Sequence, residues 1–251
     1  MTKSEQLPKR NRGKNSGDER LFGVPVMKAR LQEALSDMHY LLSRGYAERS
    51  SLAICGNRYR LNARQQQALL GMSASEEQIT RRKKRSVALT ELSNQQVAID
   101  GFNLLIILES LFSNAYIFKG LDGFYRDLSS VHGSKRVQQT TRAIETICTF
   151  YEECGISRLH WYFDKPVSNS GRLKQLLEQI ATERNYNWEI SLAFNPDKEI
   201  AASGMIAVTS DAWILDNSLH NFNFLEHYLT TCTFDNVMVF NAPNSEVIYG
   251  K

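Results

Sequence analysis

The sequence predicts an α/β protein: a parallel sheet with flanking helices, preceded by a small all-α domain. Two patterns in its 251 residues lead to this prediction. Residues 25–44 repeat apolar side chains every three to four positions, which is the spacing of a helix with one buried face. From residue 97 onward, apolar runs of four to six residues alternate with longer helical stretches. Such alternation is typical of parallel strands joined by crossover helices.

Charge separates the two predicted parts. Residues 1–96 hold 18 Lys and Arg against 9 Asp and Glu, a net charge of +9, whereas residues 97–251 carry −6. This division suggests a module that attracts a polyanion, joined to one that supplies carboxylates. The chain has no apolar run near the ~20 residues of a membrane span, and Met1 to Lys14 lack an apolar signal-peptide centre. We therefore expect a cytoplasmic protein without a membrane segment.

The basic part is predicted to contain a tail and a group of short helices. Residues 1–22 lack periodicity and are interpreted as a disordered basic tail. Residues 23–86 are predicted to form a small basic helical domain. Its helices are expected at residues 25–44, 47–55 and 63–72. Asn62 is a suitable N-cap for the third helix, and residues 73–86 are interpreted as a linker or helix end.

Two basic stretches are candidates for nucleic-acid contact. Arg58 and Arg60 flank Tyr59 in a predicted loop; arginine binds phosphate in a bidentate way, and tyrosine can stack on an unpaired base. The alternative is that both arginines form ion pairs with acids of the second domain. The run from Arg81 to Arg85 could hold a phosphate backbone, or it could be a solvated surface.

The α/β domain is predicted over residues 96–251. Strands are expected at residues 96–100, 158–163, 188–194, 205–209 and 236–240. Helices are expected at residues 102–113, 137–154, 171–184, 198–203 and 213–229. Asn103 and Ser170 are suitable first residues for two of these helices. In an open α/β sheet, ligands bind beyond the carboxyl ends of the strands, so side chains at those ends are candidates for function.

Aspartates mark these strand ends. Asp100, Asp164 and Asp211 directly end three predicted strands, Asp197 follows a fourth, and Asp216 lies on the first turns of the next helix. Crowded carboxylates repel one another, and a structure keeps such a cluster most easily by binding a cation. Oxygen ligands favour Mg²⁺ or Mn²⁺. The alternative is that strand-end aspartates cap helices or make turns.

The aspartates are predicted to act as metal ligands, as catalytic residues or as both. The predicted metal ligands are Asp100, Asp197, Asp211 and Asp216, and the predicted catalytic residues are Asp100, Asp211 and Asp164. Asp122 and Asp127 are interpreted as turn residues outside this pocket.

Further nucleic-acid contacts are predicted near the same strand ends. Ser168, Ser170 and Arg172 follow Asp164 at a helix start, where free backbone N–H groups and hydroxyls can accept a phosphate. The ordinary alternative is that Ser170 caps the helix. Asn103 completes the predicted nucleic-acid contacts, together with Arg58 and Arg60.

Two short motifs resemble a known family. The segment Ile99-Asp100-Gly101-Phe102-Asn103 is similar to the opening motif of PIN-like nucleases of the NYN branch. The segment Val208-Thr209-Ser210-Asp211 is similar to a late strand end of the same superfamily. The resemblance covers roughly residues 96–245 and implies a PIN-like fold in which these aspartates bind Mg²⁺ or Mn²⁺ for RNA cleavage. Asp197 matches the middle acidic motif loosely, because that motif is often a pair of acids and Lys198 follows here.

The N-terminal part has a resemblance of its own. Arg44-Gly45-Tyr46 and the segment from Gly56 to Leu61 are similar to a prokaryotic helical family of unknown function that precedes a PIN-like part. This resemblance implies the same pairing of domains and no particular biochemistry.

Together these patterns predict a metal-dependent ribonuclease whose partner is RNA, with the basic residues holding the strand. One alternative is a nucleic-acid-binding or regulatory protein in which the PIN-like site is degenerate and not catalytic. Another is a phosphatase acting on a small phosphate ester. The oligomeric state is left open.

Overall fold

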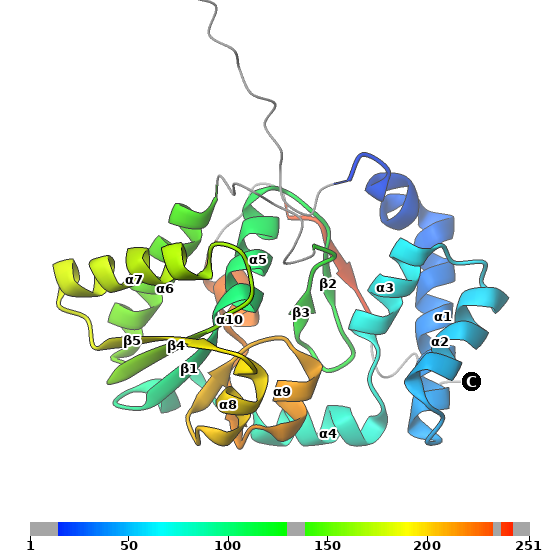
Figure 1. The fold of residues 1–251 in the computed structure, drawn as a ribbon. Helices are drawn as coiled ribbons and strands as arrows, with labels where there is room; N and C mark the ends of the chain where they lie inside the picture. The colour runs from blue at the N-terminus through cyan, green and yellow to red at the C-terminus, as the bar shows by residue number, and fades with distance from the viewer. Residues whose placement is uncertain (1–14, 130–138, 233–236, 243–251) are drawn as a thin grey trace, which may run out of the picture.

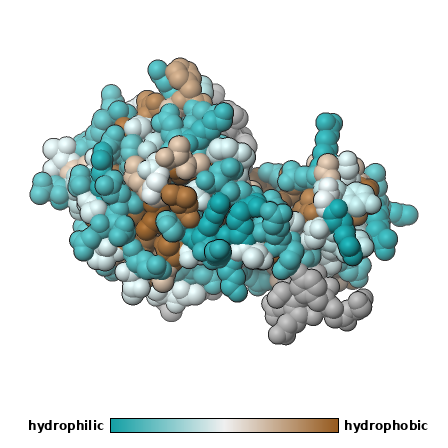
Figure 2. All heavy atoms as spheres, turned by 90° about the horizontal axis from the view of Figure 1, so that it is seen from below, coloured by the Kyte–Doolittle hydropathy of each residue, from teal (hydrophilic) through white to brown (hydrophobic). Residues whose placement is uncertain are grey.

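A computed structural model describes residues 15–129, 139–232 and 237–242 of the chain. It contains a five-stranded parallel sheet flanked by helices, with an all-helical region at residues 19–85 before it (Figure 1). The predicted fold class, an α/β protein preceded by a small helical part, is confirmed at this level. Figure 2 shows the larger α/β part and the smaller helical part as two lobes.

Four α-helices make up most of the helical region. They are α1 (Pro25–Ser43), α2 (Glu48–Arg58), α3 (Ala63–Met72) and α4 (Glu76–Arg85). Asn62 caps α3 as predicted, in a reciprocal capping box with Gln65. The stretch 73–86, predicted as a linker or helix end, is mostly helical. A second capping box, between Ser75 and Gln78, begins α4.

The predicted tail is ordered near its end. Residues 1–14 lie outside the described residues, but Glu19–Gly23 form a short helical turn, η1. The ring of Phe22 is buried with its centroid 4.9 Å from that of Phe118. Asp18 accepts hydrogen bonds of 2.6 and 2.8 Å from the Arg64 guanidinium. These partners are remote in sequence, so local composition gives no sign of them.

The main sheet has the strand order β5-β4-β1-β6-β7, with every neighbouring pair parallel. Its strands are β1 (Gln96–Asp100), β4 (Arg158–Asp164), β5 (Trp188–Ala193), β6 (Ile206–Val208) and β7 (His220–Asn221). The first four agree with the predicted strands within one residue at each end. The helices of this part are α5 (Gly101–Phe112), α6 (Thr140–Cys154), α7 (Ser170–Arg184), α8 (Pro196–Ala202), α9 (Ala212–Asn217) and α10 (Phe224–Thr231). A short 3₁₀ turn, η2 (Leu89–Leu92), precedes β1.

The predicted helix at residues 213–229 is wrong, because the chain forms α9, β7 and α10 there. Strand β7 pairs with β6, and the side chain of Asn223 then caps α10 by accepting a hydrogen bond from the Glu226 N–H. Apolar residues continue through the break, so helical periodicity does not reveal it.

The predicted last strand belongs to a different sheet. Strand β8 (Val239–Asn241) pairs with β2 (Ile117–Lys119), which also pairs with β3 (Tyr125–Arg126). Phe118 and Phe240 of this small sheet pack in one apolar cluster with Leu31 of α1 and Leu69 of α3. A shared core therefore joins the helical region to the C-terminal part of the chain.

Helix α4 makes a second connection between the two parts. It runs below the small sheet to α9 in Figure 1, and its residues contact those of α9. Among the described helices, none combines the length and apolar character that crossing a membrane requires.

Candidate functional site

A cleft of about 530 Å³ opens between the carboxyl edge of the main sheet and the helical region. Asp100, Asp164, Asp197 and Asp211 all line it. Strand β1 lies between β4 and β6, and β5 lies beyond β4, so these four chain segments end side by side. The structure thus brings together four of the five carboxylates singled out from the sequence.

Asp100 is held at the point where β1 becomes α5. Its Oδ1 accepts a hydrogen bond from the Asn103 N–H at 3.4 Å, and its Oδ2 accepts one from the Thr209 hydroxyl at 2.9 Å. The turn requires glycine at position 101, because a Cβ there would lie 2.2 Å from the ring of Phe163. This close approach explains why glycine follows the aspartate.

Asp211 begins α9. Its Oδ1 accepts hydrogen bonds from the N–H groups of Trp213 (2.8 Å) and Ile214 (3.0 Å), which is an N-cap. No described residue donates a hydrogen bond to its other oxygen, Oδ2. Helix capping, the alternative role expected for strand-end aspartates, is therefore seen at both Asp100 and Asp211. At Asp211 this role leaves one carboxylate oxygen available.

Asn103 links the two resemblance motifs. Its Oδ1 accepts hydrogen bonds from the backbone N–H and the hydroxyl of Ser210, both at 2.9 Å. The Thr209 hydroxyl oxygen accepts a further bond from the Asp211 N–H. The side-chain oxygen of Asn103, predicted to contact nucleic acid, is thus occupied in fixing the turn that carries Asp211.

The carboxylates of the cleft influence one another. Burial raises the pKa of Asp100 to about 7; the hydrogen bond from Thr209 opposes this effect, and the negative charges of Asp211 and Asp197 add to it. The pKa of Asp197 is raised by burial and by the charges of Asp211 and Asp164. Across the described residues, no basic side chain forms an ion pair with Asp100, Asp197 or Asp211. These three carboxylates therefore lack the direct ion pairs that the neighbouring acids have.

The donor chemistry fits a hard cation. The lining offers carboxylate, amide and hydroxyl oxygens and no histidine or cysteine, which matches the preferences of Mg²⁺ and Mn²⁺. In the part of the chain that the structure describes, however, no three His, Cys, Asp or Glu side chains already form a metal-holding group. Holding an ion therefore requires the carboxylates to rotate toward one another.

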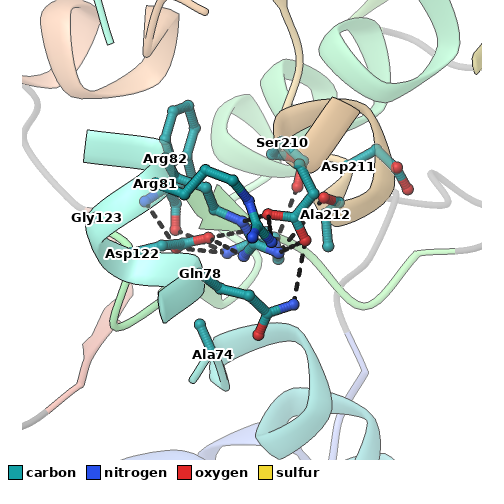
Figure 3. A network of polar contacts seen from close by, with 12 residues as sticks. Ala74, Gln78, Arg81, Arg82, Asp122, Gly123, Ser210, Asp211 and Ala212 are labelled. Atoms are coloured by element: carbon teal, nitrogen blue, oxygen red, sulfur yellow. Dashed lines mark hydrogen bonds and ion pairs between the residues drawn. The ribbon is translucent and has the colours of Figure 1, made fainter. Parts of the chain in front are cut away.

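A second acidic group beside the cleft has internal cations (Figure 3). Arg82 of α4 is 1% exposed; its guanidinium binds Asp122 at 2.7 Å and both oxygens of Asp216 at 2.9 and 2.7 Å. Arg126 binds Asp122 through two nitrogens at 2.9 and 2.6 Å. Burial acts to raise the pKa of both acids. Arg126 and Arg82 outweigh it at Asp122, Arg82 and Arg81 outweigh it at Asp216, and the pKa of each acid is lowered.

The placement of Asp216 differs from the prediction. It does not line the cleft, and its carboxylate receives hydrogen bonds from Arg82 and Gln78 and an ion pair from Arg81. The partner residues come from the helical region, about which the local pattern around Asp216 says nothing. We therefore leave Asp216 out of the proposed metal ligands.

Arg82 and Arg126 also hold the turn that carries Asp211. Arg126 Nε donates a hydrogen bond to the carbonyl of Ser210 at 3.0 Å, and Arg82 Nη2 donates to the carbonyl of Ala212 at 3.4 Å. The side chain of Asp211 itself points away from the guanidinium groups (Figure 3). The helical region thus contributes a buried residue to the frame of the acidic cleft.

The predicted basic contacts do not reach the cleft. Arg58 forms an ion pair with Asp37 at 3.3 Å, and Arg58 and Arg60 line a separate groove with Arg30. Asp37 is an acid of the helical region and not of the second domain, which had been the alternative. The helical wall of the cleft carries other side chains, including Glu48, Gln67 and Gln78.

The basic run of α4 is divided between paired and exposed side chains. Arg81 forms ion pairs with Glu77 and Asp216, and Arg82 is buried in the network described above. Lys83 and Lys84 are exposed and line another cleft, on a different side of the helix.

The loop after Asp164 is near the edge but does not line the cleft. The Ser170 side chain is buried and donates to the carbonyl of Lys165 at 3.3 Å, so its role is local. Ser168 and Arg172 are exposed. None of the three residues predicted to hold phosphate lies among those lining the cleft.

Sequence reasoning missed Asp127 and Arg126 at this site, and it assigned Arg82 a different role. Asp127, set aside as a turn residue, lines the cleft and accepts a hydrogen bond from the Ser110 hydroxyl at 2.7 Å. Arg82 and Arg126 also line it. Asp127 follows the two-residue strand β3, which is too short to leave a periodic signal.

The fold and the cleft define a class: an α/β protein whose acidic cleft at the sheet edge is closed on one side by an N-terminal helical region. The chain belongs to the family described as "Domain of unknown function (DUF5616)", whose model matches residues 89–227. A second family model, described as "Protein of unknown function (DUF434)", matches residues 30–85.

One relative is the protein named "Uncharacterized protein MJ0935" from Methanocaldococcus jannaschii. It is 27% identical over 186 residues, which cover 74% of this chain and 88% of the relative. No solved structure matches the chain.

Proposed function

We propose that this protein is a metal-dependent ribonuclease that uses the acidic cleft to hydrolyse phosphodiester bonds. One observation carries the proposal. Four strand-end carboxylates, Asp100, Asp164, Asp197 and Asp211, line a single cleft, while arginines neutralise the neighbouring acid Asp216. Such a group of carboxylates is most readily stabilised by a cation from outside the chain.

In this proposal Asp100, Asp197 and Asp211 hold Mg²⁺ or Mn²⁺. When bound, such an ion supplies activation of a water molecule and neutralisation of charge on a phosphoryl group. The hydroxyl of Thr209 fixes the orientation of Asp100. In this proposal Asp164, whose charge contributes to the raised pKa of Asp197, is the residue that accepts the proton of the attacking water.

The resemblance to PIN-like nucleases supports the same proposal. Its two motifs lie on the adjacent strands β1 and β6, and the Thr209–Asp100 and Ser210–Asn103 hydrogen bonds connect them. RNA as the substrate comes from this resemblance. The predicted cytoplasmic location is part of the proposal and agrees with the four free cysteines, because disulfides are rare in reducing compartments.

One observation favours a second candidate, a nucleic-acid-binding or regulatory protein without catalysis. Asp100 and Asp211 both cap helices, and no metal-holding group of three side chains is preformed among the described residues. A degenerate site would keep these structural roles and lose the chemistry.

Cleavage of labelled single-stranded RNA in the presence of Mn²⁺ tests the proposal. We expect cleavage by the wild-type protein and none by the double variant Asp100→Asn, Asp211→Asn. Asparagine retains a side-chain oxygen for the two helix caps, so the fold is expected to persist. Glu183→Gln, a change of an exposed carboxylate on α7, is the matched control and should cleave normally.

Binding without cleavage by the wild-type protein would favour the second candidate. Turnover of a generic phosphomonoester, with intact RNA, would instead indicate a phosphatase and contradict the ribonuclease proposal.

A further inference from the structure

Phe194 is the most exposed of the large apolar side chains in the described residues, at 79%. It directly follows β5, whose last residue, Ala193, pairs with Asp164. The Lys165 N–H donates a hydrogen bond to the Ala193 carbonyl at 2.8 Å. The phenyl ring therefore lies at the carboxyl edge of the sheet, beside the strand end that brings Asp164 to the cleft.

The exposed ring is paired with a cation. The Lys165 ammonium lies 4.7 Å from the centre of the Phe194 ring. Lys165 is exposed, and no ion pair engages it within the described residues. A ring with an ammonium group over it presents, within one contact, an aromatic surface and a positive charge.

A second aromatic residue has a comparable position. Trp213 is 45% exposed and follows Asp211 by two residues, whereas Trp161 in the main sheet is fully buried. Asp197 in turn follows Phe194 by three residues, on the first turn of α8. Exposed aromatic side chains thus accompany two of the carboxylates that line the cleft.

We propose that Phe194 and Lys165 form a base-stacking subsite for an unpaired nucleotide next to the acidic cleft. The ring stacks on the base, and the ammonium of Lys165 contacts the adjoining phosphate. Stacking of this kind requires an exposed base face, which single strands provide and a continuous duplex does not. The inference rests on the proposed function, because the neighbouring cleft is taken to be the site of RNA cleavage. A stacking subsite there would make the protein prefer single-stranded RNA.

Equilibrium binding in Ca²⁺ tests the subsite without requiring cleavage. The probes are a fluorescent single-stranded RNA, the same strand with abasic positions, and its duplex, measured by anisotropy. We expect Phe194→Ala to weaken single-strand binding about tenfold, the loss of one stacked base. Duplex affinity should stay unchanged, and Phe194→Trp should restore binding.

The abasic strand sharpens the test. The wild-type protein should bind the abasic strand less tightly than it binds the normal strand. The Phe194→Ala variant and the wild-type protein should bind the abasic strand with equal affinity. Leu219→Ala is the matched control: Leu219 is 63% exposed but precedes β7 at the opposite edge of the sheet, so its loss should change nothing.

The inference is overturned if Phe194→Ala binds single strands as wild type does, or if it weakens duplex binding equally. A Phe194→Ala protein whose mass in solution changes, with unaltered RNA binding, would show a protein interface instead. These results are independent of cleavage in Mn²⁺. A protein that stacks RNA at Phe194 but never cleaves it would retain the subsite and refute the nuclease.

Discussion

Two groups of carboxylates lie at neighbouring positions in this protein and have opposite environments. Asp122 pairs with Arg82 and Arg126, Asp216 pairs with Arg82 and Arg81, and the pKa of each acid is lowered. Asp100 and Asp197 have no ion pair with a described residue, and the pKa of each is raised. Arginines of the chain neutralise the first pair, whereas the second pair has no direct ion pair among the described residues.

This difference teaches that the location of the arginines, more than that of the acids, decides which carboxylates have a structural role and which are candidates for metal binding. Arg82 comes from α4, and through it the helical region neutralises Asp216 while leaving Asp211 available. The helical part is accordingly a component of the acidic cleft and not merely an attached basic module.

The largest expected effect comes from breaking the neutralised group. Arg82→Ala leaves buried Asp122 without one of its two arginines and Asp216 without its bidentate partner. Loss of one partner of a buried pair costs about 3–5 kcal/mol of unfolding free energy, which urea denaturation would measure. Arg81→Ala is the control; Arg81 is half-exposed, so about 1 kcal/mol or less is expected. Equal stabilities of the two variants would show that buried Arg82 matters no more to the fold than half-exposed Arg81.

Added Mn²⁺ should stabilise the protein through the carboxylates of the acidic cleft and not through Asp122 and Asp216. Mn²⁺ at a hundred times its dissociation constant should stabilise the wild-type protein by about 2.7 kcal/mol, seen as a rise in the unfolding midpoint. Asp197→Asn should lose this response. Asp216→Asn should start from a lower midpoint and retain the response, and its loss in that variant would show that Asp216 belongs to the site after all.

Removing a charge from the acidic cleft should stabilise the protein in EDTA. The pKa of Asp100 is raised to about 7, above the ordinary value for the unfolded chain, with Asp197 and Asp211 as its charged neighbours. The carboxylate therefore costs stability as pH rises from about 4 to 7. Asp100→Asn should flatten this decline and be more stable than wild type at pH 8, by at least about 1 kcal/mol. A less stable variant at pH 8 would contradict the raised pKa.

The smallest effect is expected from the hydrogen bond between the two motifs. Thr209→Val removes the hydroxyl that donates to Asp100 and accepts from the Asp211 N–H. We expect a loss of about 1 kcal/mol in stability and weaker Mn²⁺ binding, measured by denaturation and by titration calorimetry. Thr209→Ser keeps the hydroxyl and should bind Mn²⁺ as wild type does.

Local signals accounted for most of the fold. Strand β1 and its terminal Asp100 were predictable because a short apolar run, an aspartate and a glycine adjoin one another. Asn62 was predictable as a cap because capping depends on residues three positions apart. The break between α9 and α10 was not, since apolar residues continue through it and pairing with β6 decides the outcome.

The candidate site was predictable only where sheet topology determines it. Parallel strands bring their carboxyl ends together, which placed Asp100, Asp164 and Asp211 correctly at one edge. Asp216 depends on Arg82, which is 134 positions away in the chain. The ion pair of Arg58 was also not predictable. It depends on how α2 packs against α1, which carries its partner Asp37.

The most direct test of the central claim is titration calorimetry of Mn²⁺ into wild-type protein and the Asp211→Asn variant. Asparagine can still accept the two N–H bonds that begin α9, so the comparison isolates the charge of one cleft carboxylate. We predict saturable binding to the wild-type protein and a loss of at least about tenfold in affinity for the variant, in line with the removal of a charged ligand. Equal binding by both proteins, or none by wild type, would contradict the claim that these carboxylates form a metal site.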